Sequence, residues 1–446
     1  MTLDERLTNV SIIGAAGKMG SGIALLLAQE MAFLKLKPEN KGKKFRLNLI
    51  DANDDALDGL LQYLKSQALK TAEKSAVMLR DLYADRPNLV ENFDIIDQFI
   101  DDLMAMVRVG TELSLAKNSH LVFEAIVENI DVKLKVFNQL NELCSKDTFF
   151  FSNTSSVPIH LLNDGAKLGG RIIGFHFYNP PPVQRLAELI PAKSTQKELI
   201  DLSYEIAKRL KKTIFLSADV AGFIGNGHFL RDALHAITEV ERLQRDFKPF
   251  EAIYIVNKVS QDLLLRPMGI FQLMDYVGVD VMYFISKIMD KYIPDEKLDH
   301  EFLDDLYTKK ILGGQRADGS QKDGILKYEN NRPVGVFCPR EGKYQMFDEA
   351  GWTGEVNNKI GAYPDGWQPW KGLLKAKDQQ DKIRQHFEHL KSMKTLGAEL
   401  ALKYLKRSKE IGQKLVNSGI AQKPEDVNGV LTNGFYHLYG PINDYI

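Results

Sequence analysis

The fold expected for this chain is decided by the segment Ile12-Ile13-Gly14-Ala15-Ala16-Gly17-Lys18-Met19-Gly20-Ser21-Gly22. An apolar run precedes it, and the apolar spacing of residues 19–32 after it predicts a helix. A glycine-rich turn between a strand and a helix lets the backbone approach a pyrophosphate, whose charge then rests on helix N–H groups. The segment therefore predicts a dinucleotide-binding unit, with contacts expected at Gly14, Gly17, Lys18, Met19 and Gly20.

An acidic residue, Asp51, ends the next expected strand, residues 45–50. A carboxylate in that position accepts hydrogen bonds from ribose hydroxyls but repels a 2′-phosphate, so the pattern favours NAD over NADP. Asp51 lies further from Gly14 than the usual ~20 residues because residues 33–44 resemble an insertion. The glycine spacing, GxxGxxG, is also one residue longer than usual. A helix-capping role for Asp51 is the alternative.

Strands and helices alternate along the first half of the chain. Apolar runs predict strands at 121–126, 148–151, 172–175 and 214–216, and helical spacing predicts helices at 54–74 and 132–143. This alternation predicts an α/β fold with a Rossmann-like, doubly wound, mostly parallel sheet.

After residue 218 the pattern is mainly helical, which predicts a separate all-α domain. Residues 313–328 are expected to form a loop, residues 333–352 a small hairpin, and residues 379–416 a helix. We expect an NAD-binding domain at 1–218, a helical domain at 219–330, and an additional C-terminal region at 331–446.

A second run bears on chemistry: His176-Phe177-Tyr178-Asn179-Pro180-Pro181-Pro182-Val183-Gln184-Arg185-Leu186-Ala187-Glu188. An alcohol is oxidised by loss of a hydride from carbon and a proton from oxygen, and imidazole is a base suited to neutral pH. A carboxylate on the other ring nitrogen fixes the tautomer and stabilises the imidazolium. A proline turn that returns Glu188 to His176 would supply this pair; a purely structural buried pair is the alternative.

Bulk properties exclude several classes of function. The 446 residues carry a net charge of −1, so nothing suggests binding to nucleic acid or to an anionic membrane surface. Basic clusters at 41–44 and 208–212 are expected to be solvated faces, and no apolar run reaches the roughly 18 residues of a membrane helix. His386 and His389 lack a third ligand nearby, so no metal site is expected.

Localisation is expected to be cytoplasmic. Cys144 and Cys338 form no CxxC pair or disulfide framework, which fits a reducing compartment. The first residues, 1–6, are polar and acidic and do not form a signal-peptide pattern.

Several motifs resemble those of the 3-hydroxyacyl-CoA dehydrogenase family. They are the run 176–188, Ser152-Asn153-Thr154-Ser155-Ser156, Glu124-Ala125-Ile126-Val127-Glu128-Asn129, Gly222-Phe223-Ile224-Gly225-Asn226 and Asp275-Tyr276-Val277-Gly278-Val279-Asp280. The similarity extends in order from about residue 8 to 328. It implies NAD-dependent, reversible oxidation of (S)-3-hydroxyacyl-CoA to 3-oxoacyl-CoA, in fatty-acid β-oxidation or related acyl-CoA metabolism.

The resemblance also implies roles for individual residues. His176 would be the base in oxidation and the acid in reduction, with Glu188 as its partner. Ser155 and Asn226 would hydrogen-bond the reacting oxygen of the substrate.

On the cofactor side, the resemblance implies that Glu124, Glu128 and Asn129 lie beside the nicotinamide half of NAD. Contacts to CoA would fall on the helix after Asp51, where Ser66 and Lys70 are the candidates.

Departures from the family pattern leave two alternatives open. The family usually has a proline before Gly222 and an arginine after the asparagine, whereas this chain has Ala221 and Gly227. One alternative is therefore an NAD-binding relative without catalysis. The other is a dehydrogenase of free hydroxy acids, whose activity would not depend on CoA.

A weak internal repeat occupies the C-terminal part. Residues 248–251, Lys-Pro-Phe-Glu, open a helix expected to close near 266–269, and residues 423–426, Lys-Pro-Glu-Asp, open one expected to close at 439–441. The large bifunctional relatives carry a second helical unit, and this segment resembles a remnant of one. Such a unit would cover the surface used by dimeric relatives, which favours a monomer over a homodimer.

Overall fold

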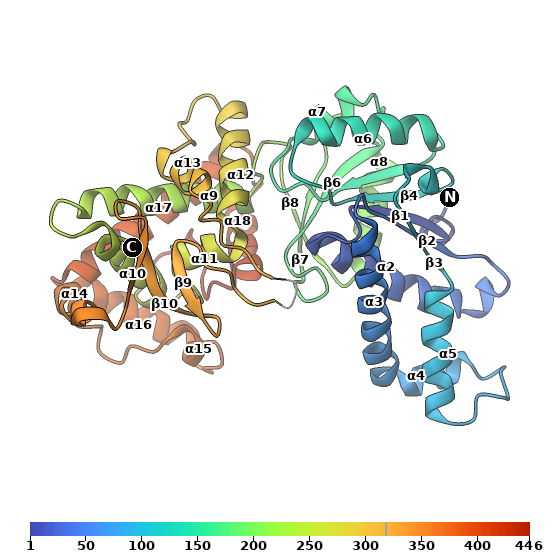
Figure 1. The fold of residues 1–446 in the computed structure, drawn as a ribbon, viewed down its shortest axis with the longest axis horizontal. Helices are drawn as coiled ribbons and strands as arrows, with labels where there is room; N and C mark the ends of the chain where they lie inside the picture. The colour runs from blue at the N-terminus through green and yellow to red at the C-terminus, as the bar shows by residue number, and fades with distance from the viewer. Residues whose placement is uncertain (317–318) are drawn as a thin grey trace. The chain divides into compact units, whose positions relative to one another are not determined.

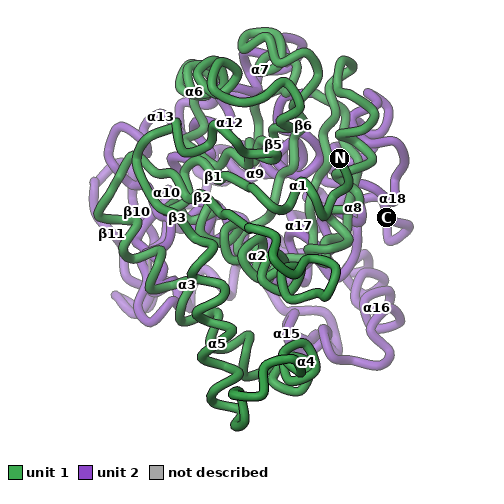
Figure 2. The backbone as a smooth tube through the Cα atoms, turned by 90° about the vertical axis from the view of Figure 1, so that its right-hand side faces the viewer, with its two compact units in different colours: residues 1–219 green, residues 220–446 purple. Residues whose placement is uncertain are grey.

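The computed structural model describes residues 1–316 and 319–446. The described chain divides into two compact units, residues 1–219 and 220–446 (Figure 2). Residues 331–446 pack in the same compact unit as residues 220–330.

The first unit is built on an eight-stranded sheet (Figure 1). The strand order is β3-β2-β1-β4-β5-β6-β7-β8, and the pairings are parallel except for β6 with β7. The predicted doubly wound, mostly parallel sheet is therefore confirmed. The strands are β1 Asn9–Ile13, β2 Arg46–Ile50, β3 Val107–Gly110, β4 Leu121–Glu124, β5 Phe149–Ser152, β6 Ile172–Phe177, β7 Leu186–Ile190 and β8 Thr213–Leu216.

Helices accompany the strands, and the central strands are buried along their whole length. Burial on both faces explains why these strands read as continuous apolar runs rather than alternating ones. The helices are α1 Leu3–Arg6, α2 Lys18–Lys35, α3 Asp54–Lys74, α4 Ala76–Leu82, α5 Asn92–Met104, α6 Ile130–Leu143, α7 Ile159–Gly165 and α8 Lys197–Arg209, with 3-10 turns η1 Pro38–Asn40 and η2 Leu113–Ala116.

The strand order reverses between β1 and β4. From β1 the chain builds outward through β2 and β3, then returns to place β4 on the other side of β1. Ligands of open α/β sheets bind outside the carboxyl ends of the strands at such a reversal. The glycine turn follows β1, so it lies at this switch point.

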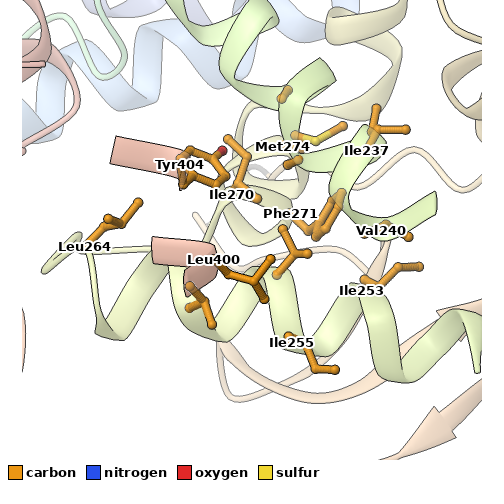
Figure 3. Packing of buried hydrophobic residues seen from close by; sticks show 14 of the residues in the cluster. Ile237, Val240, Ile253, Ile255, Leu264, Ile270, Phe271, Met274, Leu400 and Tyr404 are labelled. Atoms are coloured by element: carbon orange, nitrogen blue, oxygen red, sulfur yellow. The ribbon is translucent and has the colours of Figure 1, made fainter. Parts of the chain in front are cut away.

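The second unit is mainly helical and also carries a small antiparallel sheet, β11-β10-β9. Its elements are α9 Gly225–Leu243, α10 Pro249–Asp262, α11 Ile270–Val277, α12 Val279–Tyr292, α13 Glu301–Thr308, β9 Leu326–Glu329, β10 Arg332–Cys338, β11 Lys343–Met346, η3 Glu349–Gly351, α14 Trp352–Ile360, α15 Trp370–Leu373, α16 Gln379–Ser392, α17 Leu396–Asn417 and α18 Pro424–Gly434. The core between α9, α10, α11 and α17 includes Phe271, Leu400 and Tyr404 (Figure 3).

The predicted hairpin is confirmed as β10–β11, but it gains a third strand, β9, from a segment expected to be loop. The buried carboxylate of Asp275 explains this strand, since it accepts the N–H groups of Ile325 and Leu326 and the hydroxyl of Tyr328. Burial raises the pKa of Asp275 to about 7 in spite of these hydrogen bonds. Residues 317–318 of the expected loop lie outside the described residues.

The repeat seen in the sequence has a counterpart in this unit. α9 begins at Gly225 and α17 at Leu396, 171 residues later, and the same interval relates Asn257 to Asn428 and Gly269 to Gly440. In both copies the asparagine Oδ1 accepts a backbone N–H two residues after the glycine. The helices opened by the Lys-Pro pairs end at Asp262 and Gly434, earlier than the sequence suggested.

Among the described residues, no helix combines the length and apolar character needed to cross a membrane.

Candidate active site

His176 and Glu188 face each other across the antiparallel strands β6 and β7. His176 Nδ1 lies 3.2 Å from Glu188 Oε1. Glu188 is fully buried and His176 is 8% exposed. A carboxylate at Nδ1 fixes the tautomer and leaves Nε2 as the atom that exchanges a proton. The structure thus brings together the two residues that the sequence separated by a proline turn.

That turn is held from outside by Lys212. The Lys212 ammonium donates hydrogen bonds to the carbonyl oxygens of Pro181 and Gln184, and burial lowers the pKa of Lys212 to about 8. Helix α2 also packs closely against the proline turn, since a Cβ on Gly22 would lie 2.7 Å from Pro181 Cδ. The prediction of a solvated face for residues 208–212 is therefore wrong for Lys212, whose ammonium is bound within the protein.

Tyr178 is a third member of this cluster that the sequence did not single out. Its hydroxyl donates a 2.8 Å hydrogen bond to Glu188 Oε1, the oxygen that also contacts His176. The rings of Tyr178 and His176 lie 4.7 Å apart between centroids. Burial and the Glu188 charge raise the pKa of Tyr178 well above its usual value. Its position in the run beside His176 was the available signal.

Ser155 lies in a loop organised by Glu128. The Glu128 Oε1 atom accepts the backbone N–H groups of Ser155 and Ser156, at 2.8 and 2.9 Å, and the hydroxyl of Thr154 at 2.7 Å. Burial would raise the pKa of Glu128, but the ammonium of Lys133 and these hydrogen bonds outweigh it and lower the pKa to about 2. Glu128 is therefore ionised and fixes the backbone that carries Ser155.

Glu124, at the end of β4, is fully buried. It accepts a 2.6 Å hydrogen bond from the Lys133 ammonium and a 2.5 Å bond from the Ser152 hydroxyl. Burial alone would lower the pKa of Lys133, but Glu124 and Glu128 together raise it. Glu124 and Glu128 thus both pair with the buried ammonium of Lys133, a residue that the sequence analysis did not single out. A lysine one turn into a helix that follows two glutamates was its signal.

Asn129 stands at the start of α6, where its side-chain oxygen accepts the N–H groups of Asp131 and Val132. This is a helix N-cap, and the residue is exposed. The geometry therefore assigns Asn129 a capping contact and leaves its side-chain amide N–H₂ on the surface of the same loop.

The glycine turn fits a bound dinucleotide. Gly14 has a φ of +79°, and a Cβ on it would lie 2.6 Å from the Ala125 carbonyl oxygen. A Cβ on Gly20 would lie 2.0 Å from the Gly14 carbonyl oxygen, so only glycine permits this approach of helix to turn. Gly17 caps α2 with no side chain, and Lys18 and Gly17 are exposed. The helix N–H groups are thus open to an anion.

Asp51 is fixed beside this turn. Its Oδ2 accepts the Ala16 N–H at 2.9 Å and its Oδ1 accepts the Asn53 N–H at 3.0 Å. A backbone N–H of the glycine turn thus helps to orient the acidic residue. The helix-capping alternative is not what the structure has, because Asn53 caps α3.

The remaining expected site residues lie on other elements. Ser66 and Lys70 lie one turn apart on the exposed face of α3, where Ser66 bonds only to the Tyr63 carbonyl among the hydrogen bonds described. Asn226 lies in the first turn of α9, in the second unit. No group of three or more metal-binding side chains occurs in the described part of the chain.

Comparisons with known proteins agree with this geometry. Residues 9–220 match the family described as "3-hydroxyacyl-CoA dehydrogenase, NAD binding domain", and residues 252–323 match its C-terminal domain. The mitochondrial hydroxyacyl-coenzyme A dehydrogenase of Homo sapiens is 30% identical over 278 residues, which cover 62% of this chain and 78% of that protein. A probable 3-hydroxybutyryl-CoA dehydrogenase of Bacillus subtilis is 29% identical, covering 64% and 87%.

A solved structure also matches nearly the whole chain. The 3-hydroxybutyryl-CoA dehydrogenase of Escherichia coli K12 superposes with a TM-score of 0.64 at 19% identity, over 98% of this chain and 90% of that one. At that identity the likeness concerns the fold. With the NAD-binding domain matched from β1 through β8, NAD is the cofactor of this chain. The chain belongs to the 3-hydroxyacyl-CoA dehydrogenase family.

Proposed function

We propose that this chain catalyses the NAD-dependent, reversible oxidation of (S)-3-hydroxyacyl-CoA to 3-oxoacyl-CoA. The single observation that carries the proposal is the His176–Glu188 pair, 3.2 Å apart on the neighbouring strands β6 and β7, in a sheet that belongs to this family's NAD-binding domain. Buried and tautomer-fixed, the imidazole is suited to exchange the proton of a secondary alcohol.

The proton chemistry follows from these residues. During oxidation His176 Nε2 removes the hydroxyl proton, while Glu188 accepts the Nδ1–H and stabilises the imidazolium that forms. Ser155 donates a hydrogen bond to the reacting oxygen and stabilises the charge that develops there. For Asn226 the same role is proposed from the resemblance of its motif alone. The bound NAD supplies the acceptor for the hydride that leaves the 3-carbon. In reduction His176 returns the proton.

NAD and the CoA moiety of the substrate are bound by different elements. The open N–H groups of α2 and the Gly14–Gly20 turn hold the pyrophosphate, and Asp51 accepts hydrogen bonds from a ribose. Glu128 and Asn129 border the nicotinamide side. Ser66 and Lys70, exposed on α3, contact the CoA moiety.

The test is NADH consumption with acetoacetyl-CoA and a longer 3-oxoacyl-CoA, beside the same acids without CoA. Turnover that requires the thioester is expected, and the ratio between chain lengths begins to define the acyl pocket. Turnover of the free acids at equal rates would assign the chain to hydroxy-acid oxidation instead. Tight NADH binding with no turnover on any substrate would make it an NAD-binding relative without this chemistry.

We also propose that residues 396–446 are a second, degenerate copy of the first helices of the second unit. An interval of 171 residues relates the starts of α9 and α17, and the repeated asparagine–glycine contact has the same interval. The helices α10 and α18 begin 175 residues apart, at Pro249 and Pro424. In the structure α17 packs along α9 and α10, and Tyr404 of α17 donates to the Asp232 carbonyl oxygen of α9. Because α17 covers faces of α9 and α10, the proposal favours a monomer.

We propose a place in fatty-acid β-oxidation and a cytoplasmic location. A putative fatty acid oxidation complex trifunctional enzyme of Rickettsia felis shares 28% identity over 331 residues. Cys144 and Cys338 are both buried free thiols, which suits a reducing compartment.

A further inference from the structure

Two side chains contact one carboxylate oxygen in the hairpin formed by β6 and β7. Glu188 Oε1 accepts the Tyr178 hydroxyl at 2.8 Å and lies 3.2 Å from His176 Nδ1. The shorter contact belongs to the tyrosine. Tyr178 therefore competes with the imidazole for the charge of the same carboxylate oxygen.

The tyrosine is held in this arrangement by its surroundings. Its ring packs on the His176 ring with centroids 4.7 Å apart, and it follows directly after the buried end of β6. Its phenol is fully protonated at any physiological pH, because burial and Glu188 both raise its pKa well above 10. Tyr178 thus acts on Glu188 only as a hydrogen-bond donor, and not as an acid.

Several charged residues on elements near the hairpin contact other groups. Strands β5, β6, β7 and β8 contain no ionisable residue besides His176 and Glu188. Charged residues of neighbouring elements are paired elsewhere: Lys212 with the carbonyls of the proline turn, His160 with Asp219, Glu124 and Glu128 with Lys133, Arg209 with Glu30 and Asp4, Glu198 with Arg6, and Lys197 with Asp201. Within the hairpin, Arg185 is exposed, and both the imidazole and the tyrosine hydroxyl contact the one carboxylate oxygen Glu188 Oε1.

We propose that Tyr178 is a positioning residue that sets the pH range in which His176 exchanges its proton. By donating to Glu188 Oε1, Tyr178 weakens the stabilisation that the carboxylate gives to the imidazolium. It thereby keeps more of His176 in the neutral form that oxidation of an alcohol requires. The inference rests on the proposed dehydrogenase function. The shared carboxylate oxygen is a feature of the structure and is independent of that function.

The experiment compares the wild-type protein with Tyr178→Phe, which removes the hydroxyl and keeps the ring. The titration midpoint of the His176 ring, followed by NMR and assigned through its absence in His176→Gln, should move to higher pH. The expected shift is roughly half to one pH unit, the size of one lost hydrogen bond. The acidic limb of kcat/KM for oxidation should move in the same direction by the same amount.

Two further variants separate electrostatic tuning from mere packing. Tyr204→Phe, an exposed tyrosine of α8, should leave the midpoint unchanged. In a Glu188→Gln background, Tyr178→Phe should no longer move the His176 midpoint, because the shared charge is gone. An unchanged or lower midpoint in folded Tyr178→Phe, or an equal shift in both backgrounds, would overturn the inference. Because the NMR midpoint needs no turnover, a failure of the proposed activity would be recognised separately.

Discussion

Glu128 has a structural charge whose effect depends on pH. Its folded-state pKa, about 2, lies below the value of about 4.3 expected in the unfolded chain. The folded protein therefore binds fewer protons between these values, and the stabilisation is complete above about pH 5 and declines as pH falls through about 4 towards 2.

We predict that Glu128→Gln unfolds with a free energy about 3 kcal/mol lower than wild type at pH 7, because it loses the contact with Lys133. The difference should shrink to less than about half by pH 3, where the wild-type carboxylate begins to take up a proton. Urea unfolding of both proteins across this range measures it. A difference that stays constant with pH would show that charge is not the cause.

Asp51 supports a prediction about cofactor choice. Its carboxylate is oriented by the N–H groups of Ala16 and Asn53, so its position does not depend on the cofactor. Asp51→Ala should weaken NADH binding about 10- to 100-fold, as expected for hydrogen bonds to a charged acceptor, and NADPH binding much less. Fluorescence titration with both cofactors is the measurement, and Asp58→Ala on the exposed face of α3 is the control. Equal losses for the two cofactors would remove Asp51 from the ribose site.

At the residue scale, the sequence predicted which two residues of the chemical site lie together better than it predicted the contacts of the buried lysines. His176 and Glu188 could be paired from the sequence because one proline turn separates them, and antiparallel strands return the chain on itself. Lys212 could not be paired in this way, because its acceptors are two turn carbonyls that only tertiary packing brings within reach. Lys133 has its two glutamates close by in the sequence, but its burial depends on tertiary packing. The sequence does not show whether a charged side chain is surrounded by solvent or by protein.

At the element scale, contact between α2 and the proline turn joins the cofactor helix to the segment that carries the proton-exchanging pair. A Cβ on Gly22 would lie 2.7 Å from Pro181 Cδ and 2.9 Å from Pro182 Cδ. We predict that Gly22→Ala lowers the free energy of unfolding by about 1–3 kcal/mol through overpacking. It should also reduce turnover more than it weakens NADH binding, since the turn moves while the N–H groups of α2 remain.

The control is Gly59→Ala on α3, where nothing lies within 4 Å of an added Cβ. Alanine should stabilise that helix by roughly 0.5–1 kcal/mol. Chemical unfolding and steady-state kinetics of both variants test the pair of statements. A Gly22→Ala protein as stable and active as wild type would mean that the helix and turn are not tightly coupled.

Regular elements were predicted well where burial imposes a simple pattern. Six of the eight strands of the first unit, β1, β2, β4, β5, β6 and β8, were predicted, and the central ones are continuously apolar because both of their faces are covered. β3 was missed because it is short and partly exposed, and β7 because it begins within the run that ends at Glu188, which was interpreted for its chemistry. β9 was missed because its pairing depends on a buried carboxylate, Asp275, far away in sequence. The short helices α4 and α15 carried too few turns for a periodicity to be seen.

At the scale of the whole molecule, the C-terminal region concerns assembly. Helix α17 packs on α9 and α10, and a buried ion pair between Arg266 and Asp232 lies beneath Tyr404. If this packing replaces a partner subunit, the protein should be a monomer of about the 50.5 kDa chain mass over a wide range of concentrations. Sedimentation equilibrium measures the mass. A stable species of twice that mass would contradict the proposed substitution.

The central claim is that His176, held by Glu188, exchanges the proton of a 3-hydroxyacyl-CoA. The most direct measurement is NADH oxidation by acetoacetyl-CoA with wild type, His176→Ala and the exposed control His389→Ala, together with the Kd for NADH of each. We predict wild-type turnover, unchanged turnover in the control, and a loss of about 10²- to 10⁴-fold in His176→Ala with NADH binding retained. Turnover of His176→Ala within a few-fold of wild type would contradict the account.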